Sequence, residues 1–207
     1  RGLVGTDLTP EVIARWAAAF GTWAKAGRVV LGRDSRTSGP MFARAAMAGL
    51  MSVGCEVIDV GLVTTPTVQL AVEHHRAAGG IILTASHNPI EWNALKFIGS
   101  SGLFLDPADS MSMRQFVERG FKRATWDKLG TLTRDEGGIA SHIDRILKLS
   151  VLDVEAIRKR QFKVALDTCH GAGSTIFPQL LEALGCSVEG INLVPDGLFH
   201  RPPGPVA

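Results

Sequence analysis

Apolar residues recur along the first half of the chain with two alternating spacings. Val12, Trp16, Phe20 and Trp23 lie three or four residues apart, as on one face of a helix. Thr9 is expected to cap this helix and Gly27 to end it. The short apolar run at residues 29–31 indicates a strand. The alternation continues with helices over residues 38–54, where Ser38 is expected to be the cap, and 65–75, and with strands over residues 55–60 and 81–83. Alternating strands and helices predict a largely parallel sheet that is covered on both faces.

The pattern after the third strand predicts an antiparallel addition to this sheet. Residues 94–98 are expected to run beside residues 81–83, and Gly99 to Gly102 to form a hairpin turn. Asp106 and Pro107 begin a further helix, which a polar connection around residues 119–138 joins to a helix over residues 142–149. The predicted fold class is α/β, a three-layer α/β/α arrangement with a mixed, mostly parallel sheet.

A second unit is predicted to begin near residue 161. The pattern predicts a strand over residues 162–167, a turn over 171–174, a helix over 176–184 and a strand over 186–193. This order repeats the strand, helix and strand of residues 29–60, although the two stretches share few residues. The expected organisation is a first domain over residues 1–140, a connecting helix over 141–160 and the start of a second, similar α/β domain over 161–207.

Composition agrees with a globular protein and narrows the range of partners. Hydrophobic residues make up 45% and charged residues 20% of the 207-residue chain, close to the globular average. The net charge of +2 is too small to indicate a nucleic-acid partner, and no apolar run approaches the length that crosses a bilayer. Cys55, Cys169 and Cys186 are expected to be reduced, buried thiols of a cytoplasmic protein.

The most informative segment is Thr84-Ala85-Ser86-His87-Asn88-Pro89, a tight polar turn directly after a buried strand. Asn and Pro are typical of turns, so Ser86 is expected to emerge at a sheet edge and to face a cleft. Lys96 follows in the segment Asn93-Ala94-Leu95-Lys96. A serine in such a turn is a candidate carrier of a covalent phosphoryl group.

The serine turn and the Asn-x-x-Lys segment resemble those of the α-D-phosphohexomutases, which include phosphoglucosamine mutase and phosphomannomutase/phosphoglucomutase. Further similarities lie at residues 1–5, Arg-Gly-Leu-Val-Gly, and at residues 32–38, Gly-Arg-Asp-Ser-Arg-Thr-Ser. Residues 167–174 and 195–197 resemble stretches of the family's second domain. The resemblance therefore extends over almost the whole chain.

The resemblance implies an enzyme that interconverts hexose 6-phosphate and hexose 1-phosphate of glucosamine, mannose or glucose. Ser86 would pass its phosphoryl group to the sugar through a bisphosphorylated intermediate. Lys96 is the candidate general acid/base, because crowding by Arg1 in a partly dry pocket would favour the neutral amine. His87 and Asn88 would hold the phosphate by hydrogen bonds.

Arg33 is a candidate phosphate ligand by the same resemblance. The competing interpretation, favoured here, is a structural ion-pair network of Arg33, Asp34 and Arg36 after a strand. The turn over residues 169–173 resembles a phosphate loop, but a lone Gly-x-Gly is a weak signal, and a tight turn at the start of a domain is the preferred interpretation.

The family's metal loop, an Asp-Gly-Asp-x-Asp-Arg pattern, does not occur in the sequence. The resemblance implies Mg²⁺, bound to a phosphate oxygen on Ser86 and to carboxylates of that loop. The chain is accordingly expected to be a piece of a longer enzyme and to be inactive alone.

Two other functions remain open at the level of sequence. A serine hydrolase would need a base for Ser86, but the Gly-x-Ser-x-Gly elbow is missing and the adjacent His87 is expected to have poor geometry for a proton relay. A noncatalytic sugar-phosphate-binding α/β module is the stronger alternative. It would bind the same ligand without a phosphorylated Ser86.

Overall fold

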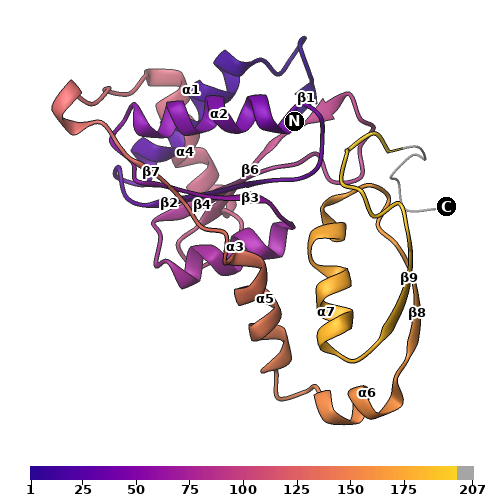
Figure 1. Ribbon diagram of the computed structural model, residues 1–207. Helices are drawn as coiled ribbons and strands as arrows, with labels where there is room; N and C mark the ends of the chain where they lie inside the picture. The colour runs from indigo at the N-terminus through magenta and orange to yellow at the C-terminus, as the bar shows by residue number, and fades with distance from the viewer. Residues whose placement is uncertain (200–207) are drawn as a thin grey trace.

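A computed structural model describes residues 1–199 of the chain and shows a central five-stranded sheet (Figure 1). The strands follow the order β6-β4-β2-β3-β7, and their bounds are β2 Val29–Arg33, β3 Val57–Leu62, β4 Gly79–Leu83, β6 Leu95–Gly99 and β7 Leu132–Arg134. All neighbouring strands are parallel except β6, which is antiparallel to β4. The predicted mixed, mostly parallel sheet is confirmed.

Helices cover both faces of this sheet, as Figure 1 shows. On one face lie α1 Pro10–Trp23, α2 Gly39–Met51 and α4 Pro107–Arg119, and on the other lies α3 Thr65–His74. A large core with Phe20 and Phe42 fills the space under α1 and α2, and a smaller core with Val68 and Val72 lies under α3. Each core removes an apolar face of the sheet from water, which stabilises the three-layer arrangement.

Local signals explain where α1 begins and ends. The Thr9 hydroxyl accepts a hydrogen bond from the Val12 amide at 3.4 Å, so Thr9 caps the helix as predicted. The helix ends at Trp23, earlier than the Gly27 that the sequence suggested. Lys25 has a φ of 55°, and this left-handed conformation is incompatible with a continuing helix.

Ser38 precedes α2 but does not cap it with its side chain, which corrects the sequence prediction. Its backbone has φ −74° and ψ −14°, and its hydroxyl instead accepts a 2.9 Å hydrogen bond from the Asn93 side-chain amide. Asn93 belongs to β5 Trp92–Asn93, which pairs with β1 Gly2–Leu3. The hydroxyl therefore links the start of α2 to the strand that follows the serine turn.

The connection between the two units is more structured than the sequence indicated. It contains the short helix η1 Trp126–Lys128 and the sheet strand β7, whose three exposed residues carry no apolar alternation. The single connecting helix expected over residues 141–160 is wrong, because α5 Gly138–Leu147 and α6 Val154–Arg160 are separate helices. The Asp153 carboxylate accepts a hydrogen bond from the Ala156 amide at 2.9 Å and so starts α6 anew.

The second unit has the predicted order of strand, turn, helix and strand. Its elements are β8 Lys163–Asp167, η2 Ala172–Thr175, α7 Phe177–Ala183 and β9 Ser187–Ile191. The strands β8 and β9 pair in parallel, and α7 lies beside them (Figure 1). The Pro-rich end of the expected second domain, residues 200–207, lies outside the described residues.

The three cysteines differ in burial. Cys55 is buried and Cys186 half-buried, whereas Cys169 is exposed, which corrects the expectation of buried thiols throughout. Burial raises the pKa of the Cys55 thiol to about 12, because the thiolate would lose its hydration. Within residues 1–199, no helix combines the length and apolar character needed to cross a membrane.

We predict that Cys55 resists alkylation in the folded chain. With its pKa near 12, the thiolate, which is the reactive form, is scarce at about pH 8. Iodoacetamide followed by peptide mapping should leave Cys55 unmodified in native protein and modify it fully in urea. Equal labelling of Cys55 under both conditions would contradict its placement in the core.

Candidate functional site

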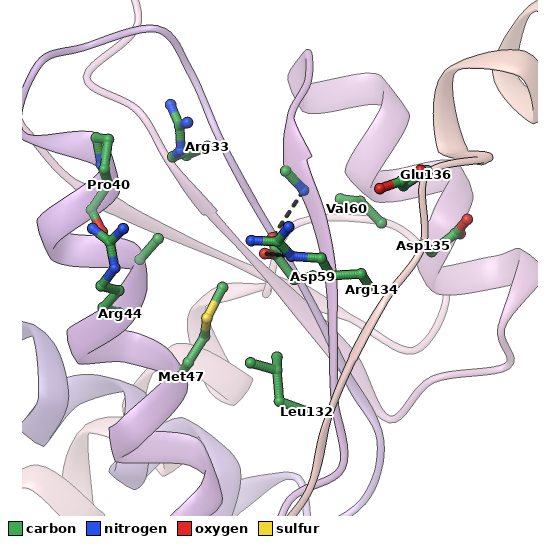
Figure 2. A pocket seen from close by; sticks show the side chains of 12 residues that line it. Arg33, Pro40, Arg44, Met47, Asp59, Val60, Leu132, Arg134, Asp135 and Glu136 are labelled. Carbon is green, nitrogen blue, oxygen red and sulfur yellow. Dashed lines mark hydrogen bonds and ion pairs between the residues drawn. The ribbon is translucent and has the colours of Figure 1, made fainter.

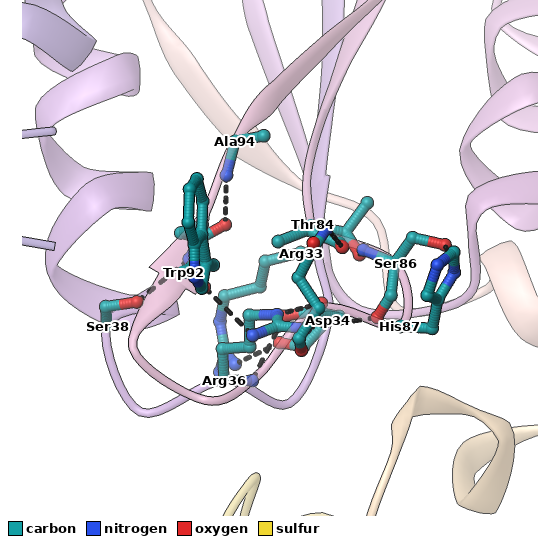
Figure 3. A network of polar contacts seen from close by, with 12 residues as sticks. Arg33, Asp34, Arg36, Ser38, Thr84, Ser86, His87, Trp92 and Ala94 are labelled. Carbon is teal, nitrogen blue, oxygen red and sulfur yellow. Dashed lines mark hydrogen bonds and ion pairs between the residues drawn. The ribbon is translucent and has the colours of Figure 1, made fainter. Parts of the chain in front are cut away.

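The turn after β4 presents Ser86 at the end of a buried strand (Figure 3). Thr84 and Ala85 are buried, whereas Ser86 is exposed and has a φ of 59°. The Ser86 amide donates to the Thr84 hydroxyl at 3.0 Å, which holds this uncommon left-handed conformation. A buried strand thus ends in a rigid turn with a solvent-facing hydroxyl.

The side chain of Arg36 is fully buried and forms hydrogen bonds with the backbone of this turn (Figure 3). Its Nε donates to the Asp34 carboxylate at 3.2 Å. Its terminal nitrogens donate to four backbone carbonyl oxygens of the turn and of the strand after it: Ser86 at 3.1 Å, Asn88 at 2.6 Å, Pro89 at 2.6 Å and Trp92 at 2.9 Å. Every N–H group of the side chain is therefore used, as burial of a charge requires.

Asp34 completes the arrangement as the partner of Arg36. One of its carboxylate oxygens accepts the Arg36 amide at 3.0 Å and the other accepts Nε. Burial raises the pKa of the Asp34 carboxyl and lowers the pKa of the Arg36 guanidinium, while the attraction between the two charges opposes both shifts. Removing either partner would leave the other charge buried without compensation.

A pocket of about 230 Å³ lies beside Ser86 and separates the two units. The residues that line it include Ser35, Thr64 and Ser86 from the first unit and Cys169, Gly171 and Ala172 from the second. The turn over residues 169–173, interpreted from sequence as structural, therefore faces the serine. The sequence did not predict that this turn lines the pocket beside Ser86, because only the folded chain brings the two turns together.

His87 and Asn88 have different surroundings within the turn. The His87 Nδ1 atom lies 3.3 Å from the Ser86 hydroxyl oxygen, so the expected poor geometry is wrong. Among residues 1–199, however, no carboxylate pairs with His87, and the third member of a proton relay is missing. The Asn88 side-chain amide donates to the Ala85 carbonyl at 2.6 Å, which braces the turn.

Lys96 and Arg1 lie near the serine turn but do not line its pocket. Lys96 is half-buried on β6 opposite Ile82, which lines the pocket, and its Nζ atom lies 5.7 Å from the centre of the Phe104 ring. Arg1 precedes β1, which pairs with β5 directly after the turn. Its exposed side chain forms no hydrogen bond or ion pair within the described chain.

Arg33 lines a different cavity, on the face of the sheet that α2 covers (Figure 2). Its Nη1 donates to the Asp34 carbonyl at 3.1 Å, but no carboxylate of residues 1–199 forms an ion pair with it. The expected ion-pair network is therefore correct for Asp34 and Arg36 and wrong for Arg33. The structure does not bring Arg33 to the pocket beside Ser86.

The residues present do not fit a magnesium site by themselves. Nowhere in residues 1–199 do three or more His, Cys, Asp or Glu side chains gather closely enough to hold a metal ion. The nearest carboxylate in the network, Asp34, already accepts hydrogen bonds from Arg36.

Comparison with known proteins gives a consistent match over both units. Residues 1–124 match the family described as "Phosphoglucomutase/phosphomannomutase, alpha/beta/alpha domain I", and residues 140–206 match its domain II. A phosphoglucomutase/phosphomannomutase of Thermococcus kodakarensis is 43% identical over 205 residues. A "Probable phosphoglucosamine mutase" of Methanosarcina acetivorans is 39% identical over 200 residues.

These relatives are longer than the chain. Each alignment covers 96% of this chain but 44% of the relative. A solved structure of a phosphoglucomutase/phosphomannomutase family protein from Burkholderia thailandensis superposes with a TM-score of 0.80 at 25% identity. That match covers 97% of this chain and 44% of the other.

We predict that Arg36→Lys destabilises the chain by about 3 kcal/mol, because lysine cannot make all the bonds of the buried guanidinium and leaves Asp34 under-compensated. Urea unfolding of the 207-residue chain measures the change in free energy of unfolding. Arg114→Lys is the matched control, since Arg114 forms an exposed pair with Glu118 and should lose at most about 0.5 kcal/mol. Equal effects of the two substitutions would refute the role assigned to Arg36.

Proposed function

The chain belongs to the phosphoglucomutase/phosphomannomutase family, and we propose that it carries the phosphoryl-transfer serine of a hexose phosphate mutase. One observation carries the proposal. Ser86 is exposed at the end of a buried strand, in a turn that a buried arginine holds, and it faces a pocket between the two units. This is the placement that a covalent phosphoryl carrier needs, since the hydroxyl must reach a substrate while its backbone stays fixed.

In the proposed reaction, phosphorylated Ser86 reacts with the free hydroxyl of a hexose monophosphate. The bond between phosphorus and the serine oxygen breaks and a bond between phosphorus and the sugar oxygen forms. A base takes the sugar hydroxyl proton, the serine oxygen gains a proton as it leaves, and the return step reverses both proton transfers. The serine then accepts the other phosphoryl group of the bisphosphorylated sugar, which releases the isomeric monophosphate. The serine is phosphorylated again at the end, so atoms and charge balance over the cycle.

Lys96 is the proposed proton carrier, and His87 is a proposed contact of the phosphate. Lys96 lies across the β4–β6 pairing from Ile82 of the pocket, and its side chain is half-buried. The His87 ring lies within hydrogen-bond distance of the serine oxygen, where the phosphate would be attached. Asn88 and Arg1 remain proposed contacts at the rim of the turn.

The cofactor and the substrate class are proposed for a chain as long as the relatives, of which this sequence covers 44%. Mg²⁺, with ligands outside this sequence, is the proposed cofactor, and a hexose phosphate is the proposed substrate class. Relatives named for glucose, mannose and glucosamine phosphates all match, which supports the class as a whole. A cytoplasmic location belongs to the same proposal.

A noncatalytic sugar-phosphate-binding module is the stronger alternative, and the contact between Ser86 and His87 is the observation that favours a hydrolase. The two functions differ in the state of the serine. A hydrolase would react at Ser86 with a fluorophosphonate probe, whereas a mutase carries phosphate on that oxygen. A noncatalytic module would bind hexose phosphate and leave Ser86 unmodified.

We predict that Ser86→Ala abolishes mutase turnover in the full natural chain that contains this sequence, because no oxygen is left to carry the phosphoryl group. The measurement is the conversion of hexose 1-phosphate to 6-phosphate, with circular dichroism to verify folding. Ser100→Ala, at an exposed turn, is the matched control and should keep its activity. Near-normal turnover of Ser86→Ala would contradict the assignment of Ser86 as the phosphoryl carrier.

Lys96→Met should lower kcat by a factor on the order of 10², because proton transfer at the sugar oxygen loses its carrier. Steady-state kinetics on the same full chain provide the value, and Lys163→Met, at an exposed position of β8, is the control. An unchanged kcat in Lys96→Met would assign proton transfer to another group.

A further inference from the structure

A second cavity, of about 400 Å³, opens on the face of the sheet that α2 covers (Figure 2). It lies between α2 and the strands β2, β3 and β7. Its apolar lining comes from Ala43, Met47 and Leu132. The pocket beside Ser86 includes the start of α3, so the two cavities lie on opposite faces of the sheet.

Two arginines line this cavity without a carboxylate partner. Arg33, half-buried at the end of β2, donates to the Asp34 carbonyl, and the exposed Arg44 donates to the Pro40 carbonyl of its own helix at 3.2 Å. Neither forms an ion pair with any carboxylate of residues 1–199. Burial lowers the pKa of Arg33, and the positive charge of Arg44 lowers it further, whereas Asp59 and Asp34 oppose both effects.

Two of the three acidic residues that line the cavity have cationic partners, Arg134 inside the cavity and His75 outside it. Asp59 accepts the Gly61 amide at 2.9 Å and lies 3.9 Å from the Nε atom of Arg134. Asp135 pairs with His75 at 2.7 Å. Glu136 is exposed and forms no ion pair within the described chain.

We propose that this cavity binds a phosphate-bearing small molecule, with the phosphate between Arg33 and Arg44. Two like charges that face one cavity repel each other, and a dianion between them would replace repulsion with charge-assisted hydrogen bonds. Guanidinium groups match the oxygen geometry of phosphate, and the volume suits a small ligand. Glu136, which forms no ion pair within residues 1–199, provides an acceptor for a hydroxyl group of the ligand body. The proposal does not depend on the chemistry at Ser86.

The test is an NMR titration of the ¹⁵N-labelled 207-residue chain with inorganic phosphate, at ionic strength matched with sodium chloride. Saturable shifts are expected at the amides of Arg44, Gly61 and Glu136. Arg44→Gln should weaken this binding at least about tenfold, since it removes a charged donor. Because Arg44 is exposed, the variant should fold, with an unchanged spectrum elsewhere.

Two further variants complete the design. Arg33→Gln should weaken binding as Arg44→Gln does, whereas Arg114→Gln, which removes a charge on α4 outside the cavity, should bind like the original chain. Shifts that do not saturate, or that are confined to the turn around Ser86, would overturn the proposal. Equal affinity of Arg44→Gln and the original chain would also overturn it.

Discussion

The buried guanidinium of Arg36 is the interaction on which the candidate site depends. It joins the Asp34 carboxylate to four carbonyl oxygens of the serine turn and the following strand. Leaving one of these carbonyl oxygens without a hydrogen-bond donor would cost free energy, because water does not replace the buried guanidinium. The backbone of the turn therefore has few alternative conformations. The backbone that carries the exposed hydroxyl of Ser86 is therefore held in place.

The residues at the end of β2 and directly after it contact different parts of the molecule. Arg33 extends to the cavity under α2, whereas Asp34 and Arg36 turn to the serine loop and Ser35 lines the pocket beside it. Arg33 is the last residue of β2, whereas Asp34 and Ser35 lie beyond the end of the strand and line the pocket beside Ser86. Neighbours in sequence thus serve sites on opposite sides of the sheet.

The sequence predicted most of the strands and helices because their apolar periods are strong, and it predicted the position of Ser86 because a turn follows a buried strand. It missed β7, whose exposed residues show no alternation. The ion pair of Arg36 with Asp34 was predicted, but the hydrogen bonds of Arg36 to the serine turn were missed, since these partners are backbone carbonyls 50 to 56 residues away. Carbonyl groups are common to all residues, so no side-chain pattern could identify them. The facing turn at Cys169 likewise depends on tertiary structure.

We propose that the turn held by Arg36 carries a covalent phosphoryl group on Ser86. Intact mass and peptide mapping of the full natural chain, as purified and after phosphatase treatment, test it most directly. We expect an added mass of about 80 Da on the Ser86 peptide that phosphatase removes, because the proposed intermediate is covalent. An active enzyme with unmodified Ser86, or with its phosphate on another residue, would contradict the account.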